Sequence, residues 1–187
     1  QSNLGLYSGQ DAAASAAVRA ALADAGVGPG EPVHAVAHSQ GAMAAELLAR
    51  QGEYDVRTLV TFGAPTTDPL PADVMAVTIR HTDDPVVALA GSIPAAERGA
   101  QGGFVAERVA DPLPGLRDIT MPAHALSAYV ETGALLDASA DPRARSIDEL
   151  WDRLGTAESV QATEYGARRV SRDDAGAGAA GGRRRCH

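Results

Sequence analysis

The sequence predicts an α/β fold in which a mainly parallel sheet is flanked by helices. Short runs rich in β-branched residues alternate along the chain with segments of helical periodicity, an order typical of βαβ units. At 187 residues the chain is long enough for one domain with a hydrophobic core. Aromatic residues make up only 4% of it, so alanine, valine and leucine must fill most of that core.

Four strands are expected along the chain. Each is a short run of apolar and β-branched residues that ends at a turn signal or at polar residues. The strands cover residues 33–37, 56–62, 74–79 and 104–109. Residues 91–103, just before the last strand, are rich in glycine and are expected to form a loop.

Four helices are expected as well. The first covers residues 10–25, and the second covers residues 40–50, directly after a serine. A third follows His124, and a fourth begins with a capping box formed by Ser146 and Glu149. The apolar side of the third helix comprises Leu126, Tyr129, Val130 and Leu136. The buried stripe of the fourth comprises Ile147, Leu150, Trp151 and Leu154.

The predicted α/β domain covers residues 10–165. Residues 1–9 have no clear pattern and are expected to form an irregular N-terminal remnant. Residues 166–187 are rich in arginine, glycine and alanine and offer nothing that could pack against the domain. This tail is therefore expected to be disordered.

The composition argues against several classes of partner and site. The formal net charge is −8 and the isoelectric point is near 5.0, so neither a nucleic acid nor an anionic membrane is an expected partner. No apolar run reaches the ~18 residues of a membrane span, and no signal peptide is recognised. The location is thus unknown, with the cytoplasm as the default. The single cysteine, Cys186, excludes an internal disulfide, and no metal or cofactor is expected.

The most informative stretch covers residues 34–43, where a short apolar run ends at Ser39 and a helical pattern starts directly after it. A serine between small residues at such a junction is typical of a nucleophile elbow, whose sharp turn exposes the hydroxyl. The usual pattern is G-x-S-x-G, and here Ala37 occupies the first glycine position while Gly41 keeps the second. The alternative is an ordinary strand–helix junction at which Ser39 only caps the helix.

A nucleophilic serine needs a histidine to take its proton and a carboxylate to orient that histidine. After Ser39 the chain offers Asp83 or Asp84, just after a strand, and then His124, just before a helix. The order of serine, acid and histidine favours a catalytic triad. If the loop of the first two aspartates turns away, the alternative acids are Asp111 and Asp118.

Three other histidines compete for the role of the base. His81 lies in the same loop as the acid and is the strongest alternative, although a hydrogen-bonded loop histidine is the preferred interpretation. His34 lies inside a strand and is expected to point into the core or against a helix. His38 is beside Ser39 in the elbow and cannot easily face its neighbour's hydroxyl.

Four motifs together resemble the fungal-type lipase (triacylglycerol lipase) family of α/β-hydrolases, in particular its actinobacterial members. They are A-H-S-Q-G at residues 37–41, V-T-F-G-A-P at residues 60–65, D-P-V at residues 84–86, and His124. In that family the strand after the elbow helix ends in a phenylalanine-glycine-x-proline turn, and the catalytic aspartate opens a D-x-V-P pattern. The resemblance covers residues 10–140.

This resemblance implies a triad of Ser39 as nucleophile, Asp84 as acid and His124 as base. It also implies an oxyanion hole whose first donor is the backbone N–H of Gln40. Val87 stands where the family has proline, a mild departure. Glutamine after the serine also occurs in the cutinase-like branch, which uses the same chemistry.

The resemblance also implies parts that this sequence does not offer. The second oxyanion donor comes from a loop after an earlier strand, but no clear strand precedes the first predicted helix. The sheet is therefore expected to lack its first strands, and the loss of one donor typically costs ~10²–10³ in rate. The open sheet edge would also invite pairing with another chain, including self-association.

Two hypotheses about function follow. The first is a serine hydrolase that cleaves carboxylic esters, from small molecules or lipids, through a triad and an acyl-enzyme. The second is a truncated, non-catalytic hydrolase-like domain that keeps the fold as a structural or binding module.

Overall fold

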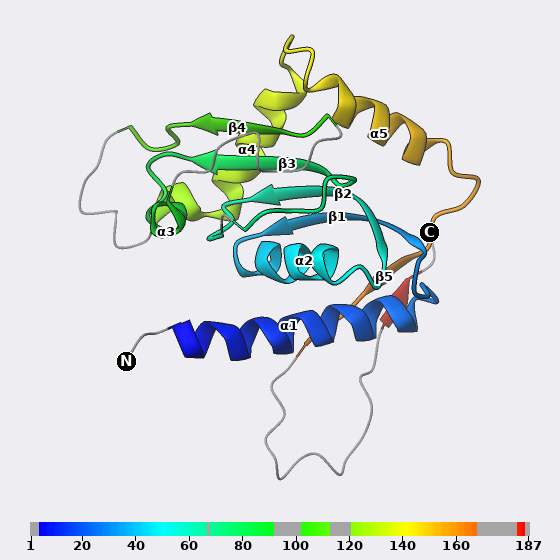
Figure 1. Cartoon of the computed structure of the whole chain (residues 1–187). Coiled ribbons are helices and arrows are strands. Elements are labelled where there is room, and N and C mark those ends of the chain that lie inside the picture. The colour runs from blue at the N-terminus through cyan, green and yellow to red at the C-terminus, as the bar shows by residue number, and fades with distance from the viewer. Residues whose placement is uncertain (1–3, 67, 92–101, 113–120, 168–182, 186–187) are drawn as a thin grey trace.

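The computed structural model describes residues 4–66, 68–91, 102–112, 121–167 and 183–185, and it has the predicted α/β architecture (Figure 1). Its centre is a four-stranded sheet, all parallel, in the order β1-β2-β3-β4. The strands are β1 (Pro32–His38), β2 (Asp55–Phe62), β3 (Met75–His81) and β4 (Phe104–Arg108). All four lie where the sequence predicts them, because each combines β-branched and apolar residues in a run of strand length.

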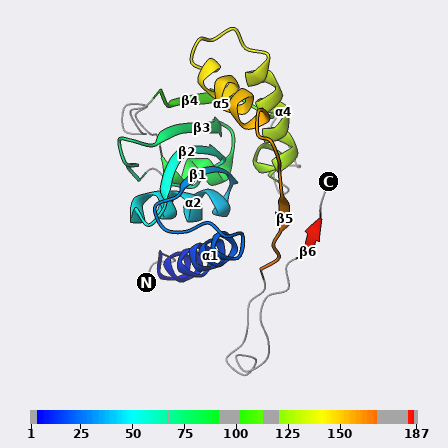
Figure 2. The ribbon, with the colours of Figure 1, turned by 90° about the vertical axis from the view of Figure 1, so that its right-hand side faces the viewer.

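Helices cover both faces of this sheet. They are α1 (Leu4–Asp24), α2 (Gln40–Gln51), α3 (Pro85–Ala90), α4 (Leu126–Asp137) and α5 (Arg145–Gly155), with a 3₁₀ turn, η3 (Pro122–His124), before α4. The helices α1 and α2 pack on one face, and α4 and α5 lie against the other (Figure 2). None of the described helices is long and apolar enough to cross a membrane.

Two clusters of apolar side chains hold these layers together. The cluster beneath α1 and α2 contains Leu48 of α2 and Leu59 of β2. The cluster beneath α4 and α5 contains Val77 of β3, Tyr129 of α4 and Ile147 of α5. Full burial of a large apolar side chain contributes about 1.5–3 kcal/mol. The two clusters therefore fix the helices that carry the candidate functional residues to the sheet.

The strand β1 forms one edge of the sheet, and among the described residues only β2 pairs with it. Along β1 the side chains of Pro32, His34 and Val36 are exposed, and Val36 keeps 56% of its surface exposed. The expectation that His34 points into the core is thus wrong, because its side chain lies at an exposed position of the edge strand. Partial burial and then the charge of Arg153 on α5 lower its pKa, so its side chain lies on the side of the sheet that α5 covers.

The ends of two helices differ from the sequence prediction. The first helix, α1, begins at Leu4, so residues 4–9 are helical and not irregular. A helix extends easily once nucleated, and the alanine-rich run that follows provides that nucleus. The capping box of α5 does not form, because Ala144 occupies the N-cap position and the Ser146 hydroxyl donates to the Arg143 carbonyl at 2.8 Å.

The apolar stripes of α4 and α5 are only partly buried. Their buried members are Tyr129, Ile147 and Leu150. Their exposed members are Leu126, Val130, Trp151 and Leu154. The four-stranded sheet covers only part of the apolar side of each helix, which corrects the expectation that both stripes face the core.

Part of the C-terminal tail forms a strand. The strand β5 (Ala162–Glu164) pairs antiparallel with β6 (Arg183–Arg185). The expectation of disorder is therefore wrong for residues 183–185. Strand pairing rests on backbone hydrogen bonds and needs no apolar side chain. Residues 168–182 and 186–187 of the tail, and residues 92–101 of the expected glycine-rich loop, lie outside the described residues.

Candidate active site

Ser39 sits in a strained turn between the end of β1 and the start of α2. Its backbone has φ 54° and ψ −125°, a conformation that a residue with a side chain rarely adopts. The Ser39 N–H donates to the Phe62 carbonyl of β2 at 2.9 Å, which ties the turn to the sheet. Ser39 is at the N-cap position of α2, but its hydroxyl makes no capping hydrogen bond. The hydroxyl is thus left to contact another group.

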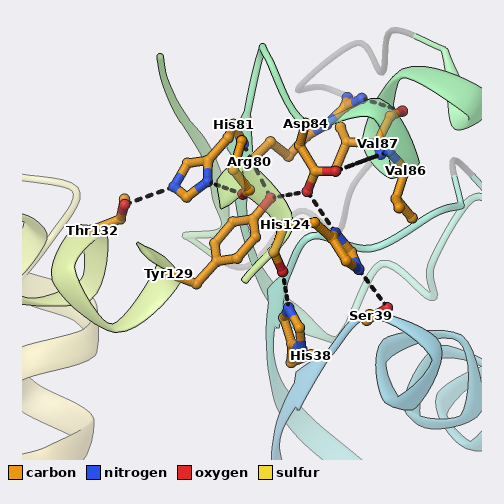
Figure 3. A network of polar contacts seen from close by, with 11 residues as sticks. His38, Ser39, Arg80, His81, Asp84, Val86, Val87, His124, Tyr129 and Thr132 are labelled. Carbon is orange, nitrogen blue, oxygen red and sulfur yellow. Dashed lines mark hydrogen bonds and ion pairs between the residues drawn. The ribbon is translucent and has the colours of Figure 1, made fainter. Parts of the chain in front are cut away.

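That group is the imidazole of His124. The Ser39 Oγ lies 2.8 Å from His124 Nε2, and Asp84 Oδ2 lies 2.7 Å from His124 Nδ1 (Figure 3). Because the carboxylate accepts, Nδ1 carries the proton and Nε2 can accept from the serine hydroxyl. The structure brings together the serine, the histidine and the aspartate that the sequence singled out.

Asp84 is fixed by the helix that it starts. It is the N-cap of α3, and its Oδ1 accepts the backbone N–H groups of Val86 at 2.9 Å and Val87 at 3.5 Å. Pro85 occupies the first helical position, where its missing N–H is not needed. Asp84 is fully buried, so its other oxygen is directed at His124 without competition from solvent.

Asp83, the neighbouring candidate for the acid, points elsewhere. Its carboxylate accepts the backbone N–H groups of Ala110 at 2.9 Å and Asp111 at 2.6 Å. Burial raises the pKa of Asp83, but these bonds outweigh that effect and the net pKa is lowered. Asp111, one of the alternative acids, contacts the Asp83 carboxylate through its backbone N–H. Asp118, the other alternative, lies outside the described residues.

His81, the alternative base, is fully buried in a different set of contacts. Its Nδ1–H donates to the Ala123 carbonyl at 2.6 Å, and its Nε2 lies 2.7 Å from the Thr132 hydroxyl. The Thr132 oxygen also accepts from Arg108 Nε at 2.7 Å. Both ring nitrogens of His81 are therefore occupied by partners other than Ser39, as expected for a hydrogen-bonded histidine.

His38 also supports His124. Its Nε2–H donates to the His124 carbonyl at 3.1 Å, and the two ring centres are 5.1 Å apart. Burial lowers the pKa of His38, and the bond to the carbonyl offsets this only in part. Together His38 and His81 hold two consecutive carbonyls, those of His124 and Ala123, so the turn that carries the candidate base is fixed from two sides.

Tyr129 is the residue of the site that the sequence analysis missed, since it was assigned only to an apolar helix face. Its hydroxyl donates to Asp84 Oδ2 at 2.7 Å and accepts the backbone N–H of His81 at 3.2 Å. The signal in the sequence is a tyrosine among the wholly apolar residues of that helix face, and the structure buries this tyrosine fully. A buried phenol usually has a hydrogen-bond partner.

An apolar groove of about 270 Å³ lies beside the triad, between β1 and α4. It is lined by Val36, Ala37, His38, Phe62, Leu126, Tyr129, Val130 and Gly133. Gln40, next to Ser39, is the first residue of α2, and the first N–H groups of a helix have no partner within it. Its N–H is the oxyanion donor that the resemblance implies.

Comparison of the chain with known protein families, with characterised proteins and with solved structures finds no match. Within the part of the chain that the structure describes, no group of three or more His, Cys, Asp or Glu side chains could hold a metal ion. The arrangement of Ser39, His124 and Asp84 can move a proton away from a hydroxyl.

Proposed function

We propose that this protein is a serine hydrolase that cleaves carboxylic esters through an acyl-enzyme. The observation that carries the proposal is the continuous contact from Ser39 Oγ to His124 Nε2 and from His124 Nδ1 to Asp84 Oδ2, at 2.8 and 2.7 Å. The resemblance of the four sequence motifs to fungal-type lipases supports the same reaction class. A serine in an ordinary helix cap would need neither partner.

In the first half of the reaction, Ser39 Oγ attacks the ester carbonyl while its proton passes to His124 Nε2. Asp84 stabilises the imidazolium that forms, and the negative charge on the carbonyl oxygen meets the N–H of Gln40 at the start of α2. The C–O bond of the ester then breaks, and the leaving alcohol takes the proton from His124. Ser39 remains acylated.

In the second half, water attacks the acyl-enzyme. His124 Nε2 removes the proton from water, and the tetrahedral intermediate collapses to release the carboxylic acid. The proton returns to Ser39 Oγ, so the site ends as it began. The apolar groove beside His38 supports acyl groups without charge as substrates.

A fluorophosphonate probe tests the proposal, because it reacts with a serine whose proton has an acceptor. We expect labelling of Ser39, together with hydrolysis of short p-nitrophenyl esters. Ser39→Ala and His124→Ala should each abolish both signals. Ser139→Ala is the matched control, because Ser139 is exposed and its hydroxyl accepts the Asp141 backbone N–H at 3.2 Å, so labelling should persist.

The alternative is a hydrolase-like binding domain without catalysis. The exposed edge of β1, where Val36 keeps 56% of its surface exposed, is the observation that favours it. Absence of both labelling and ester hydrolysis in the folded wild-type protein, at any pH between about 6 and 9 where a neutral histidine can act as base, would support this alternative.

A further inference from the structure

The hydroxyl of Tyr129 joins the acid to the strand that precedes it. It contacts Asp84 Oδ2 at 2.7 Å and the His81 N–H at 3.2 Å (Figure 3). The N–H can only donate and the carboxylate can only accept, so the phenol proton points at Asp84. Burial, and then the bond to Asp84, raise the pKa of Tyr129, which keeps the phenol protonated.

The Asp84 oxygen that Tyr129 contacts is the same one that contacts the candidate base. Oδ2 accepts from both Tyr129 and His124 Nδ1, each at 2.7 Å. Oδ1, by contrast, accepts from the described part of the chain two backbone N–H groups at the start of α3. A donor on the shared oxygen reduces the negative charge that this oxygen presents to the imidazole, and it also restricts rotation of the carboxylate.

The position of the phenol is itself fixed. Its ring stacks on the His81 ring at 3.9 Å with an interplanar angle of 5°. On another side lies Gly63, at φ 59°, where a Cβ atom would be only 2.9 Å from the Tyr129 ring. The His81 ring is held in turn by the Ala123 carbonyl and the Thr132 hydroxyl. These contacts fix the ring, and therefore they also fix the position of its hydroxyl beside Asp84.

We propose that Tyr129 is a positioning residue, whose hydroxyl orients the Asp84 carboxylate and limits the charge that Asp84 presents to His124. The inference rests on the proposed hydrolase function. Tyr129 acts through Asp84, since the hydrogen bonds of its hydroxyl among the described residues go to Asp84 and His81 and not to Ser39. Among the described residues, Asp84 and His38 hydrogen-bond to His124 and the Tyr129 ring lies edge-on to it, while His81 binds the neighbouring Ala123 carbonyl and the charge of Arg80 acts on Tyr129.

The substitution Tyr129→Phe removes the hydroxyl and keeps the stacked ring. We expect the fluorophosphonate labelling rate on its pH plateau to fall roughly 10- to 100-fold, the effect of losing one hydrogen bond to a charged group. The acid limb of the pH profile should move to higher pH, because a less neutralised Asp84 favours the protonated His124. Tyr54→Phe is the matched control, since Tyr54 is buried in the cluster on the opposite face, and neither quantity should change.

A second readout does not depend on reactivity. The proton on His124 Nδ1 gives a far-downfield ¹H NMR signal when it is bonded to a carboxylate, and Tyr129→Phe should shift that signal while Tyr54→Phe leaves it in place. Replacing tyrosine by 3-fluorotyrosine makes the phenol a stronger donor without altering the stack. This should move the acid limb to lower pH, opposite to the effect of Tyr129→Phe.

An acid limb and a downfield signal that are unchanged in Tyr129→Phe and in the fluorinated protein would overturn the proposal, even if the rate fell. If the wild-type protein neither labels nor hydrolyses esters, the hydrolase proposal fails, and the downfield signal alone then decides the role of Tyr129. A signal that still responds supports the positioning role, and one that does not overturns it.

Discussion

The two sides of the candidate site are held in different ways. On the acid–base side, Asp84 is fully buried, accepts hydrogen bonds on both oxygens, and faces a histidine whose turn is fixed by two other histidines. On the nucleophile side, Ser39 ends an edge strand whose Val36 is 56% exposed. The acid and base are thus held by several redundant contacts, whereas the nucleophile depends on one turn.

That turn stores strain, which the surrounding contacts must offset. A residue with a side chain at positive φ costs about 1–3 kcal/mol. At Ser39 the described contacts on the backbone are the N–H bond to the Phe62 carbonyl at 2.9 Å and the Ala42 N–H bond to the Ser39 carbonyl at 3.0 Å. The edge strand therefore relies on β2 and α2 to hold the serine hydroxyl towards His124.

The largest expected effect concerns the acid. Asp84→Asn replaces an oxygen that accepts from His124 Nδ1 by a group of similar shape without charge, and it favours the wrong tautomer of the imidazole. We expect the rate of fluorophosphonate labelling to fall about 10⁴-fold. Asp83→Asn is the matched control, because Asp83 binds the backbone of Ala110 and Asp111 instead. An equal loss in both variants would contradict the assignment of the acid to Asp84.

The next effect compares the two glycines on either side of the site. Gly63→Ala places a methyl group 2.9 Å from the Tyr129 ring at φ 59°, so it should lower the free energy of unfolding by about 2–4 kcal/mol from overpacking and backbone strain. A Cβ at Gly41, in the first turn of α2, meets nothing within 4 Å among the described residues. Gly41→Ala should be neutral or stabilising by up to ~1 kcal/mol. Urea unfolding measures both, and equal losses would argue against the contact with Tyr129.

The sequence predicts the central fold well because local signals agree there. The strands and the elbow at Ser39 are contiguous apolar runs followed by small residues and a helix. The short helix α3 was not predicted, because six residues that begin with Pro85 are too few for a helical period to appear. The roles of His81 and Tyr129 depend on side chains brought together from β3 and α4, and no spacing in the sequence encodes that meeting.

Surface exposure was the least predictable property. The apolar side chains of Trp151, Leu154, Leu126 and Val130 follow helical spacing yet remain exposed. Periodicity identifies the side of a helix that is apolar, but the area of the opposing sheet decides how much of that side is covered. His34 illustrates the same point, since a strand position indicates burial only where neighbours cover the strand.

A smaller effect on stability is expected from His38 when the pH changes. Burial lowers its pKa in the folded protein, so below the ordinary histidine pKa of about 6.5 the unfolded chain takes up this proton more readily. The contribution of His38 to the free energy of unfolding should therefore be fully present above about pH 6.5. It should be lost as the pH falls from there through the lowered pKa of His38 in the folded protein. Urea unfolding at several pH values should show a weaker decrease in His38→Gln. The same slope in both proteins would mean that folding does not lower the pKa of His38.

The last prediction compares a buried valine of β3 with an exposed valine of the edge strand β1, where the smallest effect is expected. Val77 of β3 is fully buried, so Val77→Thr places a hydroxyl in an apolar cluster and should cost about 1–3 kcal/mol. Val36 of β1 is 56% exposed, and Val36→Thr should change the free energy of unfolding by less than about 0.5 kcal/mol. Threonine keeps the β-branched shape in both strands, so only burial differs. A loss at Val36 comparable to that at Val77 would mean that the edge of β1 is covered in solution, and its dependence on protein concentration would then identify a second copy of the chain as the cover.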